Sequence, residues 1–259
     1  MLFELVERYV KPQRLLDNRE QRSQYWWRHG ERQTGLYVKI QFLKCVLALS
    51  IVSPQFAIAI LPNGLVYAHS IAIFAFDRLS ALAVLQSRAH ELWARFFASS
   101  MKDDLRYTPS DCFRTFPFPE EFLTNNDLGA AGEAYNAHRA ALMVAHNEGL
   151  TKTYNRFHDR REPAADIQRL RDLHAEMDRA VLTAYGWTDF AESAAPEFIS
   201  REDDPDKTRL DWPQAFKDQV LARLLDLNRS RAAEEARLGL ASGSEDEADA
   251  DDNGGDEES

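Results

Sequence analysis

Apolar residues concentrate in three short segments of the first half of the chain. These are Cys45–Val52, Gln55–Leu61 and Ile71–Phe76, all rich in Ile, Val, Phe and Ala. Ser53-Pro54 and Pro62-Asn63-Gly64 separate them, and such residues are typical of turns. The pattern predicts three buried strands joined by turns, with a hairpin among them.

The period of the apolar positions then changes to that of a helix. From Asp77 to about Ser99 the apolar residues recur every three or four positions, which predicts one helix of about five turns with Asp77 as its N-cap. Residues 99–109 are polar and turn-rich, so they are expected to be irregular. Phe113–Pro119 alternates aromatic residues with proline and is not compatible with a regular helix.

The second half of the chain has the pattern of helices throughout. Amphipathic or Ala-rich segments with few breakers occupy Leu128–Asn147, Ala164–Tyr185 and Trp212–Leu238. Gly149 and Gly186 stand where helix ends are expected. The predicted fold class is therefore α+β: a small mixed α/β domain with a short β-sheet, followed by an α-helical domain.

The charge is distributed very unevenly over the 259 residues. The net charge is −11, but nine acids and no base lie in residues 245–258. Residues 1–119 hold 15 Lys and Arg against 10 Asp and Glu, so the first part of the chain is basic although the whole is acidic. We divide the chain into domains at 1–122 and 123–238, followed by a disordered acidic tail at 239–259.

Motifs for cofactors, metals and catalysis are absent from the sequence. It contains neither Gly-x-Gly-x-x-Gly nor Gly-x-x-x-x-Gly-Lys, the motifs that bind a dinucleotide or phosphates. It also contains no Pro-Pro pair, which adenine and cytosine amino-methyltransferases need in the loop that holds the flipped base. Cys45 and Cys112 belong to no cluster, and His138 and His146 are better explained as packed or solvated than as metal ligands. No export signal and no apolar run of membrane-spanning length is present. These absences favour a protein of the reducing cytoplasm that is catalytically inactive by itself.

Two segments of the basic part are suited to nucleic acid. The first combines cations on both sides with the aromatic run Tyr25-Trp26-Trp27, a mixture that neutralises phosphates and stacks on bases. The cations are Lys11, Arg14, Arg19, Arg22, Arg28 and Arg32. The second segment carries cations and an acid that can bind base edges and phosphates, namely Lys102, Asp104, Arg106 and Tyr107. The alternatives are a solvated connector with core tryptophans for the first segment and a charged surface loop with internal salt bridges for the second.

Several further segments, taken in order, resemble one family. The ordered series is Tyr25-Trp26-Trp27, Gly35-Leu36-Tyr37, Phe74-Ala75-Phe76-Asp77, Val84–Trp93, Leu105–Phe113, Phe116-Pro117-Phe118-Pro119, Gly149–Asp159, Leu173–Val181 and Tyr185-Gly186-Trp187. This series, over roughly residues 5–190, resembles the target-recognition domain and the following helical part of MmeI-like DNA methyltransferases, which include combined restriction-modification enzymes and adenine methyltransferases of phage defence.

The resemblance implies a division of labour in a larger protein. Members of the family carry the S-adenosylmethionine site and the Asn-Pro-Pro-aromatic loop ahead of the recognition domain, so this chain is expected to be a fragment, a truncated reading frame or a separate subunit without cofactor. Its expected partners are double-stranded DNA and a methyltransferase catalytic domain in cis or in trans, and no membrane. Besides the residues above, Arg88 is expected to contact DNA, and the resemblance implies that Lys152, Arg156 and His158 contact the DNA backbone. The alternative for Tyr154-Asn155-Arg156-Phe157 is a packed turn whose polar groups satisfy one another.

Two alternatives to this function remain open. The chain could instead be an interaction subunit that binds a methyltransferase partner without touching DNA, or, least favoured, an enzyme of unrelated chemistry. The acidic tail adds a separate hypothesis: it competes with DNA for the basic surface and limits non-specific binding.

Overall fold

The computed structural model of the chain describes residues 2–28, 33–101, 104–200 and 208–239. It separates into two compact units, Met1–Leu43 and Lys44–Ser259, here called the N-terminal unit and the main unit. Except for Gly239, the predicted acidic tail lies outside the described residues. The described helices include none that is long and apolar enough to cross a membrane.

The regular elements among the described residues of the N-terminal unit are short helices. They are α1 (Leu2–Tyr9), α2 (Lys11–Arg14), α3 (Glu20–Gln24) and α4 (Thr34–Ile40). Neither α1 nor α2 buries a residue. The apolar side chains of this unit therefore remain largely at the surface.

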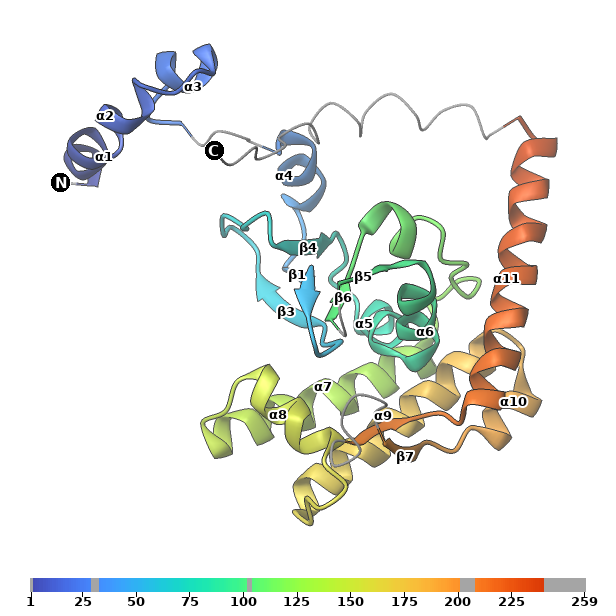
Figure 1. Cartoon of the computed structure of the whole chain (residues 1–259). Helices are drawn as coiled ribbons and strands as arrows, with labels where there is room; N and C mark the ends of the chain where they lie inside the picture. Colours follow the sequence, from blue (N-terminus) through green and yellow to red (C-terminus); the bar gives the residue numbers. More distant parts are fainter. Residues whose placement is uncertain (1, 29–32, 102–103, 201–207, 240–259) are drawn as a thin grey trace. The chain divides into compact units, whose positions relative to one another are not determined.

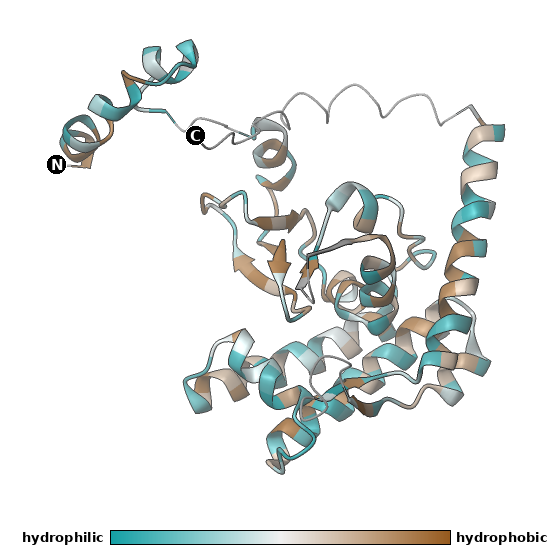
Figure 2. Ribbon diagram, in the orientation of Figure 1, coloured by the Kyte–Doolittle hydropathy of each residue, from teal (hydrophilic) through white to brown (hydrophobic). Residues whose placement is uncertain are grey.

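The first sheet of the main unit is antiparallel with the order β3-β1-β4 (Figure 1). It is formed by β1 (Cys45–Ser50), β3 (Ala59–Pro62) and β4 (Ile71–Phe74), and its hydrophobic strands are coloured brown in Figure 2. The three predicted strands are confirmed, but the second begins at Ala59 rather than Gln55. The buried Gln86 side chain explains the difference, because it donates to the Phe56 carbonyl at 3.0 Å and accepts from the Ile58 amide at 2.8 Å.

A second antiparallel sheet has the order β2-β6-β5. Its strands are β2 (Val52–Ser53), β5 (Ser99–Met101) and β6 (Asp104–Arg106). The expectation of an irregular segment over residues 99–109 is therefore wrong. The polar composition was misleading because these strands are short and their partner β2 lies about fifty residues earlier in the chain.

Two helices replace the single helix predicted from Asp77. They are α5 (Leu79–Gln86) and α6 (Arg88–Phe97). Between them Ser87 is extended, and its hydroxyl oxygen accepts from the His90 amide at 3.4 Å as the N-cap of α6. Apolar spacing continues across this break, so the pattern did not reveal it. The N-cap residue of α5 is Arg78, not Asp77.

The remaining helices follow the predicted pattern closely. The long helices α7 (Asn126–His146), α9 (Ala165–Ala184) and α11 (Gln214–Arg237) confirm the three predicted ones. The structure adds the short π-helix η1 (Pro109–Phe113), α8 (Leu150–His158), α10 (Thr188–Ser193) and the hairpin of β7 (Glu197–Ser200) with β8 (Thr208–Asp211). This arrangement confirms the α+β class.

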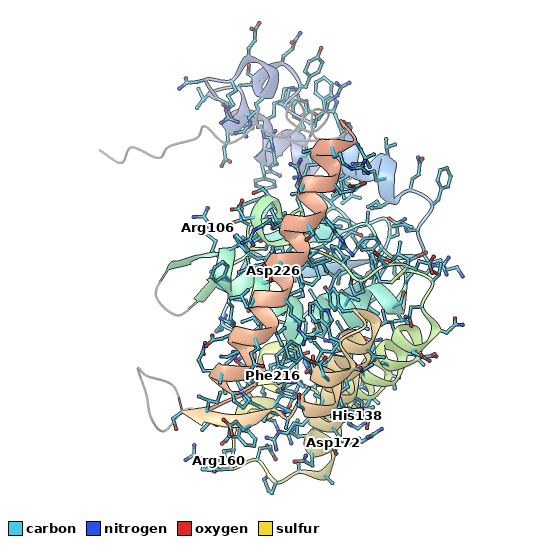
Figure 3. All side chains as sticks on the ribbon, turned by 90° about the vertical axis from the view of Figure 1, so that its right-hand side faces the viewer. Arg106, His138, Arg160, Asp172, Phe216 and Asp226 are labelled. Atoms are coloured by element: carbon cyan, nitrogen blue, oxygen red, sulfur yellow. The ribbon has the colours of Figure 1, made fainter. Side chains whose placement is uncertain are left out.

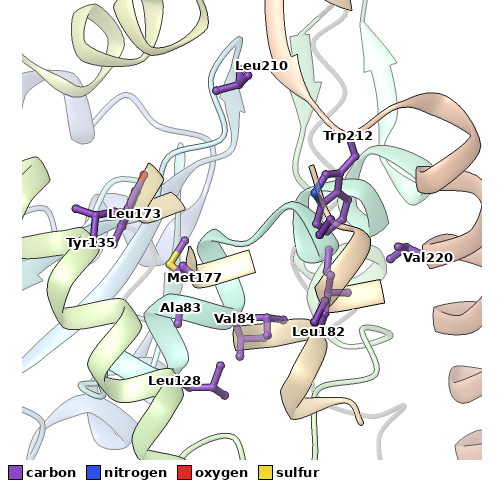
Figure 4. Packing of buried hydrophobic residues seen from close by; sticks show 14 of the residues in the cluster. Ala83, Val84, Leu128, Tyr135, Leu173, Met177, Leu182, Leu210, Trp212 and Val220 are labelled. Atoms are coloured by element: carbon purple, nitrogen blue, oxygen red, sulfur yellow. The ribbon is translucent and has the colours of Figure 1, made fainter. Parts of the chain in front are cut away.

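One hydrophobic cluster joins the α5–α6 segment to the helical half. Figure 4 shows Ala83 and Val84 of α5 among Leu128, Met177 and Leu182, from helices α7 and α9. The predicted boundary at residue 122 therefore falls inside a shared core. The division into two domains remains a prediction about their roles.

The contact between α5 and α7 is unusually close. At Gly132 of α7, an added Cβ would lie 2.1 Å from the carbonyl oxygen of Leu79 in α5. A glycine is needed here because the backbones of the two helices approach each other directly. This close approach holds α5 against α7 of the helical half.

Candidate nucleic-acid interface

The β5–β6 hairpin presents one of the exposed residues among those predicted to bind DNA. Arg106, the last residue of β6, pairs in register with Val52 on one side and Ser99 on the other. Its side chain is exposed and points outward at the edge of the main unit in Figure 3, with no partner among the described residues. Lys102 lies outside the described residues, and of Asp104 the structure describes only the backbone, in β6.

Tyr107 supports the hairpin from within. Its side chain is fully buried, and its hydroxyl donates to His90 Nε2 at 3.1 Å while the ring packs against Phe56 and Phe74. Burial raises the pKa of the hydroxyl well above its ordinary value. Tyr107 cannot stack on a base in this position, so its predicted DNA contact is corrected to a supporting role next to Arg106.

The hydrogen bonds of His90 fix its tautomer. Nδ1 lies 2.8 Å from the Leu85 carbonyl oxygen, which can only accept. Nδ1 must therefore carry the hydrogen, leaving Nε2 to accept from Tyr107. Burial lowers the pKa of His90 to about 4, so the ring is neutral at pH 7.

Arg88 is also buried, contrary to its predicted role in DNA binding. Its guanidinium is 3% exposed and forms an ion pair with Asp178 of α9, which is 1% exposed. Further hydrogen bonds reach the Leu210 carbonyl at 3.2 Å and His174 Nδ1 at 3.0 Å. The N–H groups of the guanidinium therefore point into the protein. Arg88 joins α6 to α9 and β8, and it is not available to a duplex.

Of the three predicted backbone contacts on α8, Lys152 and Arg156 differ in accessibility. Lys152 is 70% exposed and lies 3.3 Å from Glu148. Arg156 is 19% exposed and is held by Glu162 at 2.8 Å and by Glu148 at 3.2 Å. The hydrogen bond that Arg156 donates to the Glu162 carboxylate is the main cause that raises the pKa of Arg156. Two carboxylates already compensate the charge of Arg156, so Lys152 is the better candidate for a phosphate contact.

Buried contacts hold α8 in place relative to the second sheet. Arg171 of α9 donates to the Phe157 carbonyl at 2.9 Å and to the Arg156 carbonyl at 3.1 Å, which satisfies the carboxyl end of α8. On the exposed side, Gln55 Nε2 donates to Asn155 Oδ1 at 2.9 Å. Since Gln55 follows β2, and β2 pairs with β6, these contacts fix α8 close to the sheet that carries Arg106.

In the N-terminal unit the basic and aromatic residues contact one another. The Arg28 guanidinium lies 4.5 Å from the centre of the Tyr25 ring and 5.8 Å from that of Trp27. Lys11 lies 4.7 Å from the centre of Trp26. Arg28 is exposed and stays available to phosphate, but the rings are partly occupied by the unit's own cations. The predicted contact Arg32 lies outside the described residues.

Sequence reasoning missed two buried arginines that position this surface. Arg139 of α7 donates to the Ile58 carbonyl at 2.8 Å and to the Tyr154 hydroxyl at 3.0 Å, and Arg171 holds α8 as described. Both occupy apolar-face positions of their helices, four residues after Tyr135 and Ile167 respectively. An arginine on the apolar face of a predicted helix is the sequence signal that could have identified both as buried residues.

The described residues offer no catalytic or metal centre. They contain no group of three His, Cys, Asp or Glu side chains that could hold a metal ion. The acidic stretch Asp203–Lys207 lies outside the described residues. Residues suited to S-adenosylmethionine were not found in the sequence, and no strand of the described parts leads into a glycine-rich loop.

Comparison with known proteins supports the resemblance seen in the sequence. Residues 50–120 match the family model of the MmeI target recognition domain. In fold, the chain is similar to the solved structure of the Type IIL restriction-modification enzyme MmeI in complex with DNA, with a TM-score of 0.60 and 16% sequence identity. The match covers 90% of this chain and 26% of that one, so this chain spans about a quarter of the solved protein. No curated protein matches the sequence.

Proposed function

We propose that the chain is the DNA-recognition portion of an S-adenosylmethionine-dependent adenine methyltransferase, acting in the cytoplasm in restriction-modification or phage defence. Its catalytic domain resides outside this chain, in cis or in trans. The observation that carries the proposal is the match of residues 50–120 to a target recognition domain. This range contains the hairpin that exposes Arg106 on a buried support.

The chemistry of the hairpin suits direct readout of DNA. A two-stranded ribbon fits the major groove, and an arginine at its edge can donate two parallel hydrogen bonds to guanine. Arg106 is exposed, while the next residue, Tyr107, is anchored on His90. Such a support fixes the backbone from which the guanidinium reaches a base edge, so that contacts to the wrong base are penalised.

Lys152 of α8 supplies a different kind of contact in this proposal. Its ammonium group is mostly exposed and acts as a point charge, which suits a phosphate oxygen rather than a base edge. Phosphate contacts fix the position of the protein on DNA and base contacts select the sequence. The two residues therefore predict two distinguishable mutant phenotypes.

The test is selection of bound duplexes from a random-sequence pool by the full chain, followed by titrations at 50–200 mM salt. Arg106→Ala is expected to relax the preference at one base pair by roughly 5- to 150-fold, the equivalent of one bidentate contact. Lys152→Ala is expected to weaken all sequences alike and to lower the salt slope by about one. Failure of the full chain to bind duplex DNA, or binding without any base preference, would refute the proposal.

A second candidate function rests on the N-terminal unit. Its apolar side chains are unusually accessible, with Leu2 81% and Leu16 84% exposed, and Phe3, Tyr9 and Leu15 more than half exposed. An exposed apolar surface of this kind is typical of a docking site. We infer that this unit binds the methyltransferase partner. A chain that ignores DNA but co-purifies with that partner would favour this role over recognition.

A further inference from the structure

Four arginines from separate parts of the sequence lie on or next to neighbouring elements of the main unit. Arg106 ends β6, Arg95 belongs to α6, Arg209 to β8, and Arg160 follows α8. Figure 3 shows Arg106 and Arg160 pointing outward on the same side, one near the top and one near the bottom of the main unit. None of Arg95, Arg160 and Arg209 was singled out in the sequence.

Glu91 connects the two middle arginines. Arg95 donates to its carboxylate at 2.9 Å, and Arg209 forms an ion pair with the same oxygen. Burial alone would raise the pKa of Glu91, but the guanidiniums of Arg209 and Arg95 hold it well below its usual range. One carboxylate therefore faces two guanidiniums, and one positive charge stays uncompensated.

Nearby charges do not remove this excess. Asp211 and Asp178 are engaged with Arg88 and Lys217. Burial lowers the pKa of Arg209; the carboxylates of Glu91 and Asp211 oppose this shift, and the positive charges of Arg95 and Arg88 add to it. His158, which also faces this cluster, is neutral because burial holds its pKa well below the ordinary value. An anion at this place would relieve the mutual repulsion of the guanidiniums.

The two ends of the series are held by backbone contacts. The Arg160 amide donates to Thr208 Oγ1 at 3.2 Å, directly beside Arg209 in β8, and that hydroxyl donates to the His158 carbonyl at 2.7 Å. At the other end Ser99, two residues after α6, pairs in register with Arg106. The side chain of Arg160 is exposed and has no partner in the described part of the chain. It therefore has its charge free for a ligand.

Building on the proposed function, we propose that Arg95, Arg209 and Arg160 form a phosphate-binding track for the sugar–phosphate backbone of the duplex that the Arg106 hairpin reads. Guanidinium groups suit this task because they bind phosphate oxygens bidentately and are always charged. A row that starts at a base-reading residue and continues over rigid elements favours an extended polyanion over a single small anion.

The experiment measures the salt dependence of duplex binding by the full chain, between 50 and 200 mM salt. Arg160→Ala is expected to lower the slope of log K against log salt by about one. The loss of affinity between 50 and 200 mM salt should therefore be about 3.5-fold smaller for the variant than for the wild type. Arg160→Lys keeps the charge and should keep the slope. Arg209→Gln should act like Arg160→Ala, and Arg160→Ala remains informative where Arg209→Gln unfolds.

The matched control is Arg229→Ala. Arg229 is 79% exposed and pairs with Asp226 at 3.1 Å on α11, and in Figure 3 Asp226 lies away from the edge that carries Arg106 and Arg160. The control should leave the slope unchanged. A chain that binds DNA with the same slope after Arg160→Ala overturns the track but not the proposed function. A chain that binds no duplex at all overturns both.

Discussion

The buried ion pair between Arg88 and Asp178 offers the sharpest test of the structural reasoning. Asp178→Asn keeps the shape of the side chain but removes the closest countercharge of the Arg88 guanidinium, which is 3% exposed, and leaves only Asp211 at 4.0 Å. Removing one partner of a buried pair typically costs about 3–5 kcal/mol. For a unit of this size each kcal/mol lowers Tm by roughly 2–4 °C, so we expect a drop of about 6–20 °C.

The assay is thermal and urea unfolding of the full chain at pH 7, with a double-mutant cycle. Arg88→Met combined with Asp178→Leu removes both charges and fills the space with apolar atoms. Such replacements are often neutral or stabilising, so the double variant should be more stable than Asp178→Asn.

Two results would refute this reasoning. One is a loss of less than about 1 kcal/mol for Asp178→Asn, which would mean that the pair is solvated. The other is an Arg88→Met variant that unfolds like the wild type but binds DNA with a lower salt slope. That outcome would restore the original prediction that Arg88 contacts DNA.

Two further predictions concern packing and pH. Gly132→Ala should destabilise the main unit by about 1–3 kcal/mol in a urea titration, since the added Cβ meets the backbone of α5. The control is Gly129→Ala in the same helix, where nothing lies within 4 Å of the added Cβ; it should be neutral or slightly stabilising. Equal losses of stability in the two variants would contradict this explanation. His90 has a folded pKa of about 4 against about 6.5 when unfolded, so its contribution to stability is complete above pH 6.5 and is lost as the pH falls towards 4. Unfolding at pH 5 should cost about 2 kcal/mol less than at pH 7 on this account, and a His90→Gln variant with the same pH dependence as wild type would speak against it.

Long-range contacts explain most of what the sequence did not predict about the fold. The long helices and the buried first sheet followed from their apolar periods, which report burial directly. The pairing of β2 with β6 joins segments about fifty residues apart, and no local pattern specifies such a pairing. The break at Ser87 escaped because a capping serine inside an apolar run looks like an ordinary polar position.

The candidate site was predictable in place but not in detail. Composition and motif order led to the segment that contains Arg106, which lies exposed on a hairpin. Charge and residue type could not distinguish Arg106 from Arg88, because a guanidinium that meets a buried carboxylate looks the same in sequence as one that faces solvent. The partner Asp178 lies ninety residues away, and only the folded structure brings the two together.

The shared core across residue 122 has a consequence for exchanging this segment between related chains. A chimaera cut at that residue would separate Ala83 and Val84 from Leu128, Met177 and Leu182, so the graft would meet foreign side chains inside its core. The close approach at Gly132 adds a steric condition, since any donor must present a helix backbone that fits a glycine. Under the proposed function, changes of sequence preference are therefore better introduced by single replacements on the β5–β6 hairpin than by transplanting whole domains.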